Sequence, residues 1–378
     1  MSKQKEYLKT PLRGKRKDVE PKVIYFSWFP TYDCNYRCSY CAVQEVAHTP
    51  FTNPPGFKVL PPDEWEVIWK RIYDMYGTCF IHFNGGEPFY YPDFIRIVER
   101  IARYHVMEFS TNLSFDVDTF IGCIPPERVY LIGSSFHPEF ADFDEYLKKL
   151  KKLLEARYEA RFNLVAYPPI IDDLEPKLKM MKENGILNTL LIFHGLYNGK
   201  SYPDAYTKED KEKLLKLKKY LGPEYETMIN WSLRDKEKIG GDPEADNSPK
   251  PPVEDQHETA DRKTQEEQPQ EVKGEHPGNL EDHDNEKSGD KETEPAYCRM
   301  GQMYARIHPD GDVIRCCAKT NVSIGNIFDK DFALNEEAQI CEDPDCICWR
   351  HMVVGREEEW LQGWPEDISR LCRGRDKD

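Results

Sequence analysis

Residues 23–41 read VIYFSWFPTYDCNYRCSYC, a run of β-branched and aromatic residues that leads into three closely spaced cysteines. The run before Pro30 is typical of a buried strand. Cys34, Cys38 and Cys41 then lie together on the loop that follows this strand. Thiolates with three and then two residues between them can converge on one iron–sulfur cluster, and three protein ligands for four irons leave one iron open. The stretch therefore predicts a strand followed by a cluster-binding loop.

The same strand begins a repeated pattern that extends to about Trp231, in which short β-branched or aromatic runs alternate six times with amphipathic segments. That alternation is typical of βα units around a parallel sheet. Six units without a seventh and eighth predict an α/β fold, a partial (β/α)6 barrel resembling an incomplete TIM barrel, with its chemistry at the carboxyl ends of the strands. We expect strands at 23–28, 79–84, 106–111, 128–134, 160–166 and 188–194, and helices at 62–75, 92–104, 144–157, 174–184 and 208–220.

Composition divides the 378 residues into four segments. Residues 1–22 form a basic N-terminal tail, and residues 23–235 contain the βα units. Residues 236–294 interrupt the pattern, because 18 Asp and Glu stand against 6 Lys and Arg from 240 to 294, without Phe, Trp or Tyr. Such a segment buries too little apolar surface to offset ordering entropy, so we expect a disordered acidic insert, either a tolerated loop or a docking arm. Residues 295–378 form a small cysteine-rich domain.

Charge and hydropathy limit the partners and the location. The formal net charge is −16, and an excess of Lys and Arg occurs only in the N-terminal tail, so we expect no nucleic-acid partner and no membrane partner. No apolar run approaches the roughly 18 residues of a membrane span, and the first residues lack a secretory signal. We therefore expect a cytoplasmic protein. In that reducing compartment the twelve cysteines indicate metal ligands before disulfides.

A second motif follows the second expected strand, where residues 84–88 read NGGEP. Two glycines after a strand indicate by themselves only a turn. The two motifs at the ends of consecutive strands, however, resemble the signature of the radical S-adenosylmethionine (radical SAM) superfamily, a C-x3-C-x2-C loop with an aromatic residue before its last cysteine, followed by GGEP. The resemblance implies that the three cysteines hold a [4Fe–4S] cluster whose open iron binds S-adenosylmethionine (SAM). It also implies that reduction cleaves SAM to a 5′-deoxyadenosyl radical.

The resemblance further implies a set of contacts to SAM. The glycines would let the backbone approach the methionine moiety, an aromatic ring would pack on the adenine, and polar residues at strand ends would contact ribose or carboxylate. The expected cofactor-binding residues are Tyr40, Gly85, Gly86, Glu87, Ser110, Asn112 and Ser135. Ordinary capping explains the last three as well. His137 and His194 also follow expected strands, where a structural role competes with acid–base or substrate contact.

Seven of the twelve cysteines follow the insert. Cys298, Gly311 and Cys316 are spaced as in the opening C-x(9–15)-G-x4-C of SPASM and twitch domains, which add auxiliary [4Fe–4S] clusters to radical SAM enzymes. Residues 310–312 form an expected turn between two short strands. Beyond Cys316 the spacing departs from the full SPASM pattern, so the resemblance implies one auxiliary cluster. Its implied ligands are Cys298, Cys316, Cys346 and Cys348, with Cys341 as a substitute for either of the last two, while Cys317 is expected to be a packing neighbour and Cys372 has no assignment.

Zinc is the alternative for both cysteine groups. In the first loop zinc would need a fourth Cys or His, which the loop lacks; His48 is the nearest candidate. In the C-terminal segment four thiolates could hold a tetrahedral zinc instead of a cluster. Either centre would help to stabilise a segment that is small for a core of its own. Cys79 and Cys123 are interpreted as small buried apolar residues.

Three functions fit these motifs. The first is an enzyme that abstracts hydrogen from a small or medium hydroxylated metabolite, with electrons from a flavodoxin or ferredoxin. The second is a maturase that modifies a peptide; such relatives often carry a leader-binding domain before the barrel, and only 33 residues precede Cys34. The third is a non-catalytic zinc or electron-carrier protein, which would need neither the glycine pair nor an open iron. The glycine motif favours an enzyme, and the substrate is not marked by any motif.

Overall fold

The computed structural model describes residues 24–41, 52–222, 297–316 and 322–340. All of them belong to one compact unit formed by residues 1–234 and 295–378. Its centre is a nine-stranded sheet in the order β12-β11-β10-β1-β2-β3-β4-β5-β6. The strands from β1 to β6 and the neighbouring β10 run parallel, and the described strands do not close the sheet on itself. The open α/β barrel expected from the sequence is therefore confirmed.

The consecutive strands from β2 to β6 are joined by connections that return to the amino-terminal edge of the sheet, because neighbouring strands pair in parallel. The strands of the main sheet are β1 (Tyr25–Trp28), β2 (Phe80–Phe83), β3 (Val106–Thr111), β4 (Val129–Ser135), β5 (Ala160–Val165), β6 (Leu187–Leu191), β10 (Tyr304–Ile307), β11 (Asp312–Ile314) and β12 (Ser323–Asn326). The helices are α3 (Pro62–Tyr76), α4 (Phe94–Ile101), α5 (Val117–Cys123), α6 (Phe143–Glu155), α7 (Leu174–Glu183) and α8 (Lys208–Lys216). Two small sheets pair β7 (Gly195–Tyr197) with β8 (Lys200–Tyr202) and β9 (Tyr297–Cys298) with β13 (Gln339–Ile340).

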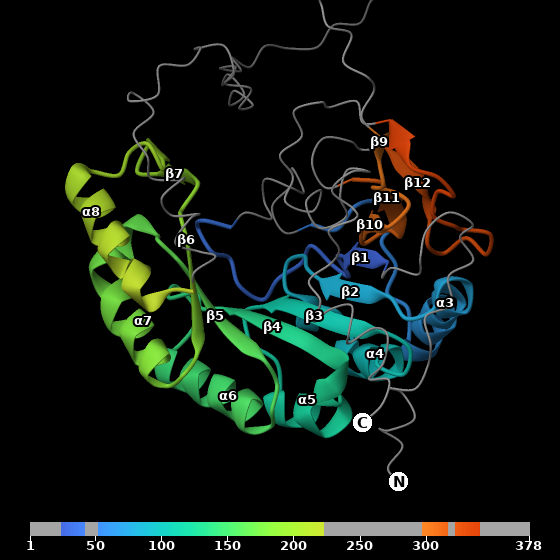
Figure 1. Cartoon of the computed structure of the whole chain (residues 1–378), viewed down its shortest axis with the longest axis horizontal. Coiled ribbons are helices and arrows are strands. Elements are labelled where there is room, and N and C mark those ends of the chain that lie inside the picture. Colours follow the sequence, from blue (N-terminus) through green and yellow to red (C-terminus); the bar gives the residue numbers. More distant parts are fainter. Residues whose placement is uncertain (1–23, 42–51, 223–296, 317–321, 341–378) are drawn as a thin grey trace, which may run out of the picture. The chain divides into compact units, whose positions relative to one another are not determined.

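The helices α3 to α7 lie along one side of the curved sheet, and the other side is free of these helices (Figure 1). Helix α6 shows why the chain folds this way. Asp142 caps its first turn by accepting hydrogen bonds from two backbone N–H groups, and Tyr146, Leu150 and Leu153 form a buried stripe. Phe162 of β5 packs against that stripe with its ring 5.8 Å from Tyr146. One face of the sheet is therefore an apolar core.

The expected strands and helices are found, although several of their bounds differ by two to four residues from those observed. Strand β3 has the expected bounds, and α3 ends one residue later than expected. Residues 92–104 are helical only from Phe94 to Ile101, and the helix begins at Phe94 because Asp93 before it adopts a left-handed conformation. The sequence did not predict the short hairpin of β7 and β8. It also did not predict that β10 pairs in parallel with β1, which joins the C-terminal segment to the barrel sheet.

A buried histidine makes the stability of this core depend on pH. His105 is fully buried; its Nδ1 accepts the Cys79 backbone N–H at 3.1 Å, and its Nε2 donates to the Trp69 carbonyl at 3.0 Å. Burial lowers its pKa from 6.5 to about 3, so below pH 6.5 the unfolded chain binds a proton that the folded chain does not. The free energy of unfolding should therefore fall by about 2 kcal/mol from pH 8 to pH 5 through this group alone. Denaturant titrations under anaerobic conditions should show a flatter pH dependence for His105→Gln, and equal slopes would contradict the assignment.

Candidate iron–sulfur and cofactor site

The three cysteines of the first motif lie on the loop after β1, at the carboxyl edge of the sheet. Cys34 and Cys38 are buried, with 9% and 6% of their surface exposed, and Cys41 is partly exposed. The Cys41 backbone N–H donates to the Cys38 carbonyl at 3.3 Å, so the second and third cysteines share one turn. Burial raises the pKa of the Cys34 thiol to about 11 and that of Cys38 to about 12, and repulsion from Cys41 adds to both shifts. The loop therefore keeps two of its three thiols away from solvent.

This donor set fits an iron–sulfur cluster. Thiols whose pKa is raised by burial and mutual repulsion remain protonated at neutral pH unless positive charge is brought to them. Iron brings that charge and binds thiolates preferentially, so cluster binding and deprotonation of the loop would occur together. Among the residues that the structure describes, no three His, Cys, Asp or Glu side chains surround a position for a single metal ion.

The glycine pair after β2 packs against the segment that leads into Cys34. The Gly86 N–H donates to the Thr31 carbonyl at 3.0 Å, and the next N–H along the chain donates to the Asp33 carbonyl at 2.9 Å. A Cβ on Gly85 would lie 2.3 Å from the Thr31 oxygen, and one on Gly86 would lie 2.1 Å from the Asp33 oxygen. Only glycine allows this approach. In the described structure the glycine pair thus holds the segment that leads into Cys34. The expected contact of the pair with the methionine moiety of SAM stays a prediction.

The carboxylate of Glu87 joins the ends of β2 and β3. It is buried and accepts hydrogen bonds from the Thr111 hydroxyl and the Asn112 backbone N–H, both at 2.7 Å, and from the Phe89 N–H at 3.2 Å. Burial raises the pKa of Glu87 to about 7, although these hydrogen bonds oppose the shift. Its expected contact with SAM remains a prediction, whereas the structure shows a buried anchor between two strand ends.

Ser110 and Ser135 also lie at strand ends, where they were expected. The Ser110 hydroxyl lies 2.9 Å from Nε2 of His82, and Nδ1 of His82 lies 2.8 Å from the Tyr25 hydroxyl. Ser135 accepts a long hydrogen bond of 3.5 Å from the Asn163 amide. The sequence analysis did not single out His82 or Tyr25, although the period-two pattern of β1 and β2 places them on one face of the sheet. A role of both serines in binding SAM stays a prediction.

Tyr40, which precedes the last cysteine of the loop, lies within a group of aromatic rings. Its ring lies 4.5 Å from Tyr167 and 5.9 Å from His137, with which it is stacked, and 6.4 Å from Phe193. Burial lowers the pKa of His137 to about 4, so that this side chain is neutral at pH 7. His194, by contrast, is exposed. The structure thus brings Tyr40 and His137 together and leaves His194 outside this group.

Two side chains that the sequence did not reveal hold the loop at its ends. Glu139 accepts hydrogen bonds from the Ser39 backbone N–H at 2.8 Å and from the Ser39 hydroxyl at 2.6 Å, and this hydroxyl also lies 2.8 Å from the Tyr167 hydroxyl. On the other side, Asn53 accepts the Tyr32 N–H at 2.7 Å and donates to the Asp33 carboxylate at 2.8 Å. Among the residues that make these contacts, only Tyr167 directly follows an expected strand. That position is the one signal in the sequence that could have indicated a role in holding the loop.

The C-terminal cysteines are described only in part. Cys298 lies in β9, where the structure describes the backbone, and Cys316 follows β11 and is partly exposed. Strands β10 and β11 are antiparallel around residues 308–311, as expected for the turn at Gly311. The predictions for Cys317, Cys341, Cys346, Cys348 and Cys372, and those for the insert at residues 236–294, lie outside the described residues. The ligands of an auxiliary cluster therefore stay a prediction.

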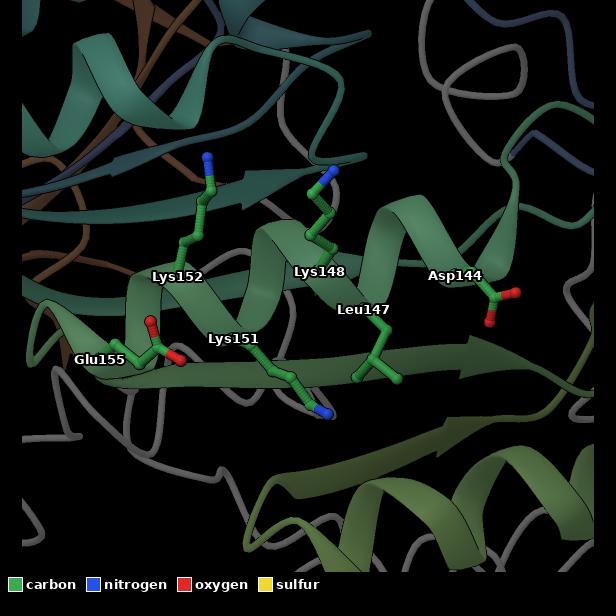
Figure 2. Close-up of a pocket in the computed structure, with 6 residues that line it drawn as sticks. All are labelled: Asp144, Leu147, Lys148, Lys151, Lys152 and Glu155. Carbon is green, nitrogen blue, oxygen red and sulfur yellow. The ribbon is translucent and has the colours of Figure 1, made fainter.

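A hollow of about 350 Å³ on α6 does not have the character of a site. It is lined by Asp144, Leu147, Lys148, Lys151, Lys152 and Glu155, all from one helix. Lys148 and Lys152 point away from Lys151, so their charges do not converge (Figure 2). Lys152 also donates to the Asp118 carboxylate at 2.6 Å. We interpret this surface as a solvated helix face.

Comparison with known families agrees with the geometry. A model of the Radical SAM superfamily matches residues 28–221, just over half of the chain, and a model of an iron–sulfur cluster-binding domain, SPASM, matches residues 298–357. The class defined by the open barrel and its cysteine loop is that of radical SAM enzymes. The chain belongs to the radical SAM superfamily and carries a C-terminal SPASM domain. Its cofactors are a [4Fe–4S] cluster, SAM and an auxiliary iron–sulfur cluster.

Individual curated proteins resemble this chain only over short stretches of sequence. A stretch of 70 residues is 39% identical to a GTP 3′,8-cyclase of Pasteurella multocida, covering 18% of this chain and 19% of that protein. A stretch of 93 residues is 34% identical to a GTP 3′,8-cyclase of Haemophilus influenzae, covering 24% and 26%. The alignments thus span only about a quarter or less of these curated relatives.

Similar solved structures include that of anSMEcpe with bound AdoMet, which is another abbreviation for SAM. It is 15% identical with a TM-score of 0.46, covering 83% of this chain and 79% of that chain. SuiB of Streptococcus suis bound to S-adenosylmethionine is 16% identical with a TM-score of 0.45, covering 83% and 65%.

In the part of the chain that the structure describes, no helix has the length and apolar character needed to cross a membrane.

Proposed function

We propose that this enzyme cleaves SAM reductively at a cluster held by Cys34, Cys38 and Cys41, and abstracts hydrogen from a small or medium hydroxylated metabolite in an oxidation or rearrangement. The auxiliary cluster takes up an electron or helps to position the substrate. The observation that carries the choice of substrate is the polar face of the barrel sheet that α3 to α7 do not cover.

Register partners on adjacent strands share a face of a sheet. Ser27, His82 and Glu108 are partners across β1, β2 and β3, and Arg306 of β10 is paired with Ser27 on the other side. The residues next to them along the strands instead pack aromatic rings against the helices. Strands of parallel sheets are usually apolar on both faces. A row with an arginine, a histidine and a glutamate on one face supports a polar ligand there.

The row lies on strands whose carboxyl ends carry the cysteine loop and the glycine pair, so a ligand on this face would lie next to the cluster site. SAM, when bound to the reduced cluster, supplies the radical that takes a hydrogen atom. The chain's own residues bind and orient the substrate. Glu108, whose carboxylate is 3.9 Å from Nδ1 of His82, would accept hydrogen bonds from substrate hydroxyls. Arg306 would contact an electronegative substituent.

The GTP 3′,8-cyclases support the same substrate class, because GTP, the substrate in their name, is a small hydroxylated molecule. The matched stretch is short, so it supports the class and not the nucleotide.

A peptide maturase is the second candidate, since a peptide is also polar. A one-electron donor such as flavodoxin or ferredoxin would serve either reaction, and we propose the cytoplasm as the compartment that keeps these thiols reduced.

The function is tested by anaerobic reconstitution with iron and sulfide, followed by reduction in the presence of SAM. Wild-type enzyme should form 5′-deoxyadenosine, measured by mass spectrometry, and a low-molecular-weight fraction of cell extract should increase its rate. Stimulation that protease treatment of the fraction removes would instead support the maturase. Absence of 5′-deoxyadenosine from a cluster-loaded protein would contradict both enzymes, and a colourless, zinc-loaded protein would support the non-catalytic alternative.

The auxiliary cluster gives a separate prediction. If one such cluster is present, reconstituted wild type should contain about eight irons per chain, and the double variant Cys298→Ala with Cys316→Ala should contain about four. The remaining irons should still react with SAM, because the first loop is unchanged. An iron content near eight in the double variant would exclude both cysteines as ligands, and four irons in wild type would exclude the second cluster.

A further inference from the structure

We propose that Asn112 is a positioning residue of the [4Fe–4S] cluster, whose side-chain amide donates an N–H···S hydrogen bond to Cys34 and thereby raises the cluster's reduction potential. The inference rests on the proposed assignment of Cys34 as a cluster ligand. It gives Asn112, which follows β3, a role toward the cluster in place of one toward SAM.

The orientation of this side chain is determined by its hydrogen bonds. Asn112 is 5% exposed, and its Oδ1 accepts the Ser114 backbone N–H at 3.0 Å, which identifies the oxygen end of the amide. Nδ2 therefore points the other way, where Sγ of Cys34 lies at 3.7 Å and Oδ1 of Asn35 at 2.9 Å. An amide nitrogen has two N–H donors, and here each has one acceptor. Every polar group of the side chain is thus engaged within the protein.

A hydrogen bond to a ligand sulfur has a defined electronic effect. Reduction adds negative charge to the cluster and its thiolates, and an N–H donor stabilises that charge more in the reduced state than in the oxidised state. The bond therefore shifts the reduction potential to more positive values. Because Cys34 and Asn112 are both buried, solvent screens this effect little. Partners of ligand residues commonly orient the ligand and tune the metal in this way.

Two variants test the inference. Asn112→Asp keeps the oxygen that accepts from Ser114, but it lacks the N–H donor and adds negative charge beside Cys34. Asn112→Leu removes the donor without adding charge. Asn184→Asp is the matched control, because Asn184 is an exposed residue at the end of α7 whose side-chain amide donates to the Met180 carbonyl of the same helix. The readouts are iron content, the reduction potential from an EPR-monitored titration without SAM, and the dissociation constant of SAM. The relevant EPR signal is the one that changes when SAM is added.

We expect both Asn112 variants to keep their iron and to show a more negative potential than wild type, with the larger shift in Asn112→Asp and none in Asn184→Asp. Weaker SAM binding with an unchanged SAM-free potential would overturn the inference and make Asn112 a SAM ligand. Loss of the cluster from both variants would also overturn it, because the role would then be structural only. Failure of wild type to hold a cluster would instead reject the proposed function, so the two failures are distinguishable.

Discussion

Cys38→Ala is expected to abolish formation of 5′-deoxyadenosine and to remove about four irons per chain from the reconstituted protein. Cys38 is 6% exposed and shares a turn with Cys41, so the substitution removes one of the two thiols that this turn holds together. Two protein ligands hold a four-iron cluster poorly, and without the cluster no electron reaches SAM. Iron analysis, EPR and product measurement on one anaerobic preparation check the result.

Cys123→Ala is the matched control, because Cys123, which was expected to be buried, is a partly exposed thiol at the end of α5 and is distant in sequence from the cysteine loop. It should retain wild-type iron and wild-type formation of 5′-deoxyadenosine. A Cys38→Ala protein that still carries about eight irons and produces 5′-deoxyadenosine would show that the loop is not the cluster site. Equal loss in both variants would point to general instability of the protein.

Much of the barrel could be predicted because each element is determined by neighbouring residues. The buried strand β3 was predicted with its observed bounds, and α6 follows from the apolar stripe that begins at Tyr146. The pairing of β10 with β1 could not be predicted, because Tyr304 and its partner Tyr25 are separated by most of the chain and no local pattern selects between possible neighbours. The short hairpin after β6 was missed because three-residue strands carry too little periodicity to be recognised.

The candidate site, like the fold, could be predicted from the sequence only in part. The cysteine spacing and the glycine pair are local signals, so the sequence identified them and their position at strand ends. The contacts that hold the loop are not local. Glu139 reaches Ser39 across 100 residues, and Asn112 reaches Cys34 across 78. Glu139, two residues after His137, belongs to no recognisable motif, so only the three-dimensional structure reveals its contact with Ser39. Sequence thus indicated the chemistry, and the structure adds the residues that position it.

Gly86→Ala is expected to reduce formation of 5′-deoxyadenosine by about 100-fold, since a displacement near 1 Å at a catalytic group has effects of that size. The added Cβ would lie 2.1 Å from the Asp33 carbonyl oxygen and 2.4 Å from that of Tyr32. Both are backbone atoms, so relief of the clash must displace the segment that leads into Cys34. The hydrogen bond of the Gly86 N–H to the Thr31 carbonyl would be lost as well. Iron content and product formation measure the consequence.

Gly122→Ala separates this clash from the general effect of replacing a glycine. A Cβ on Gly122 would meet no atom within 4 Å, and the residue lies in α5, where alanine should stabilise the fold by roughly 0.5–1 kcal/mol. This variant should keep its clusters and its activity. If Gly86→Ala retained both as well, the close approach between residues 31–33 and the glycine pair would not be what fixes Cys34. The cysteine loop would then have to be held mainly by the side chains of Asn53, Glu139 and Asn112, because these make the remaining hydrogen bonds to it.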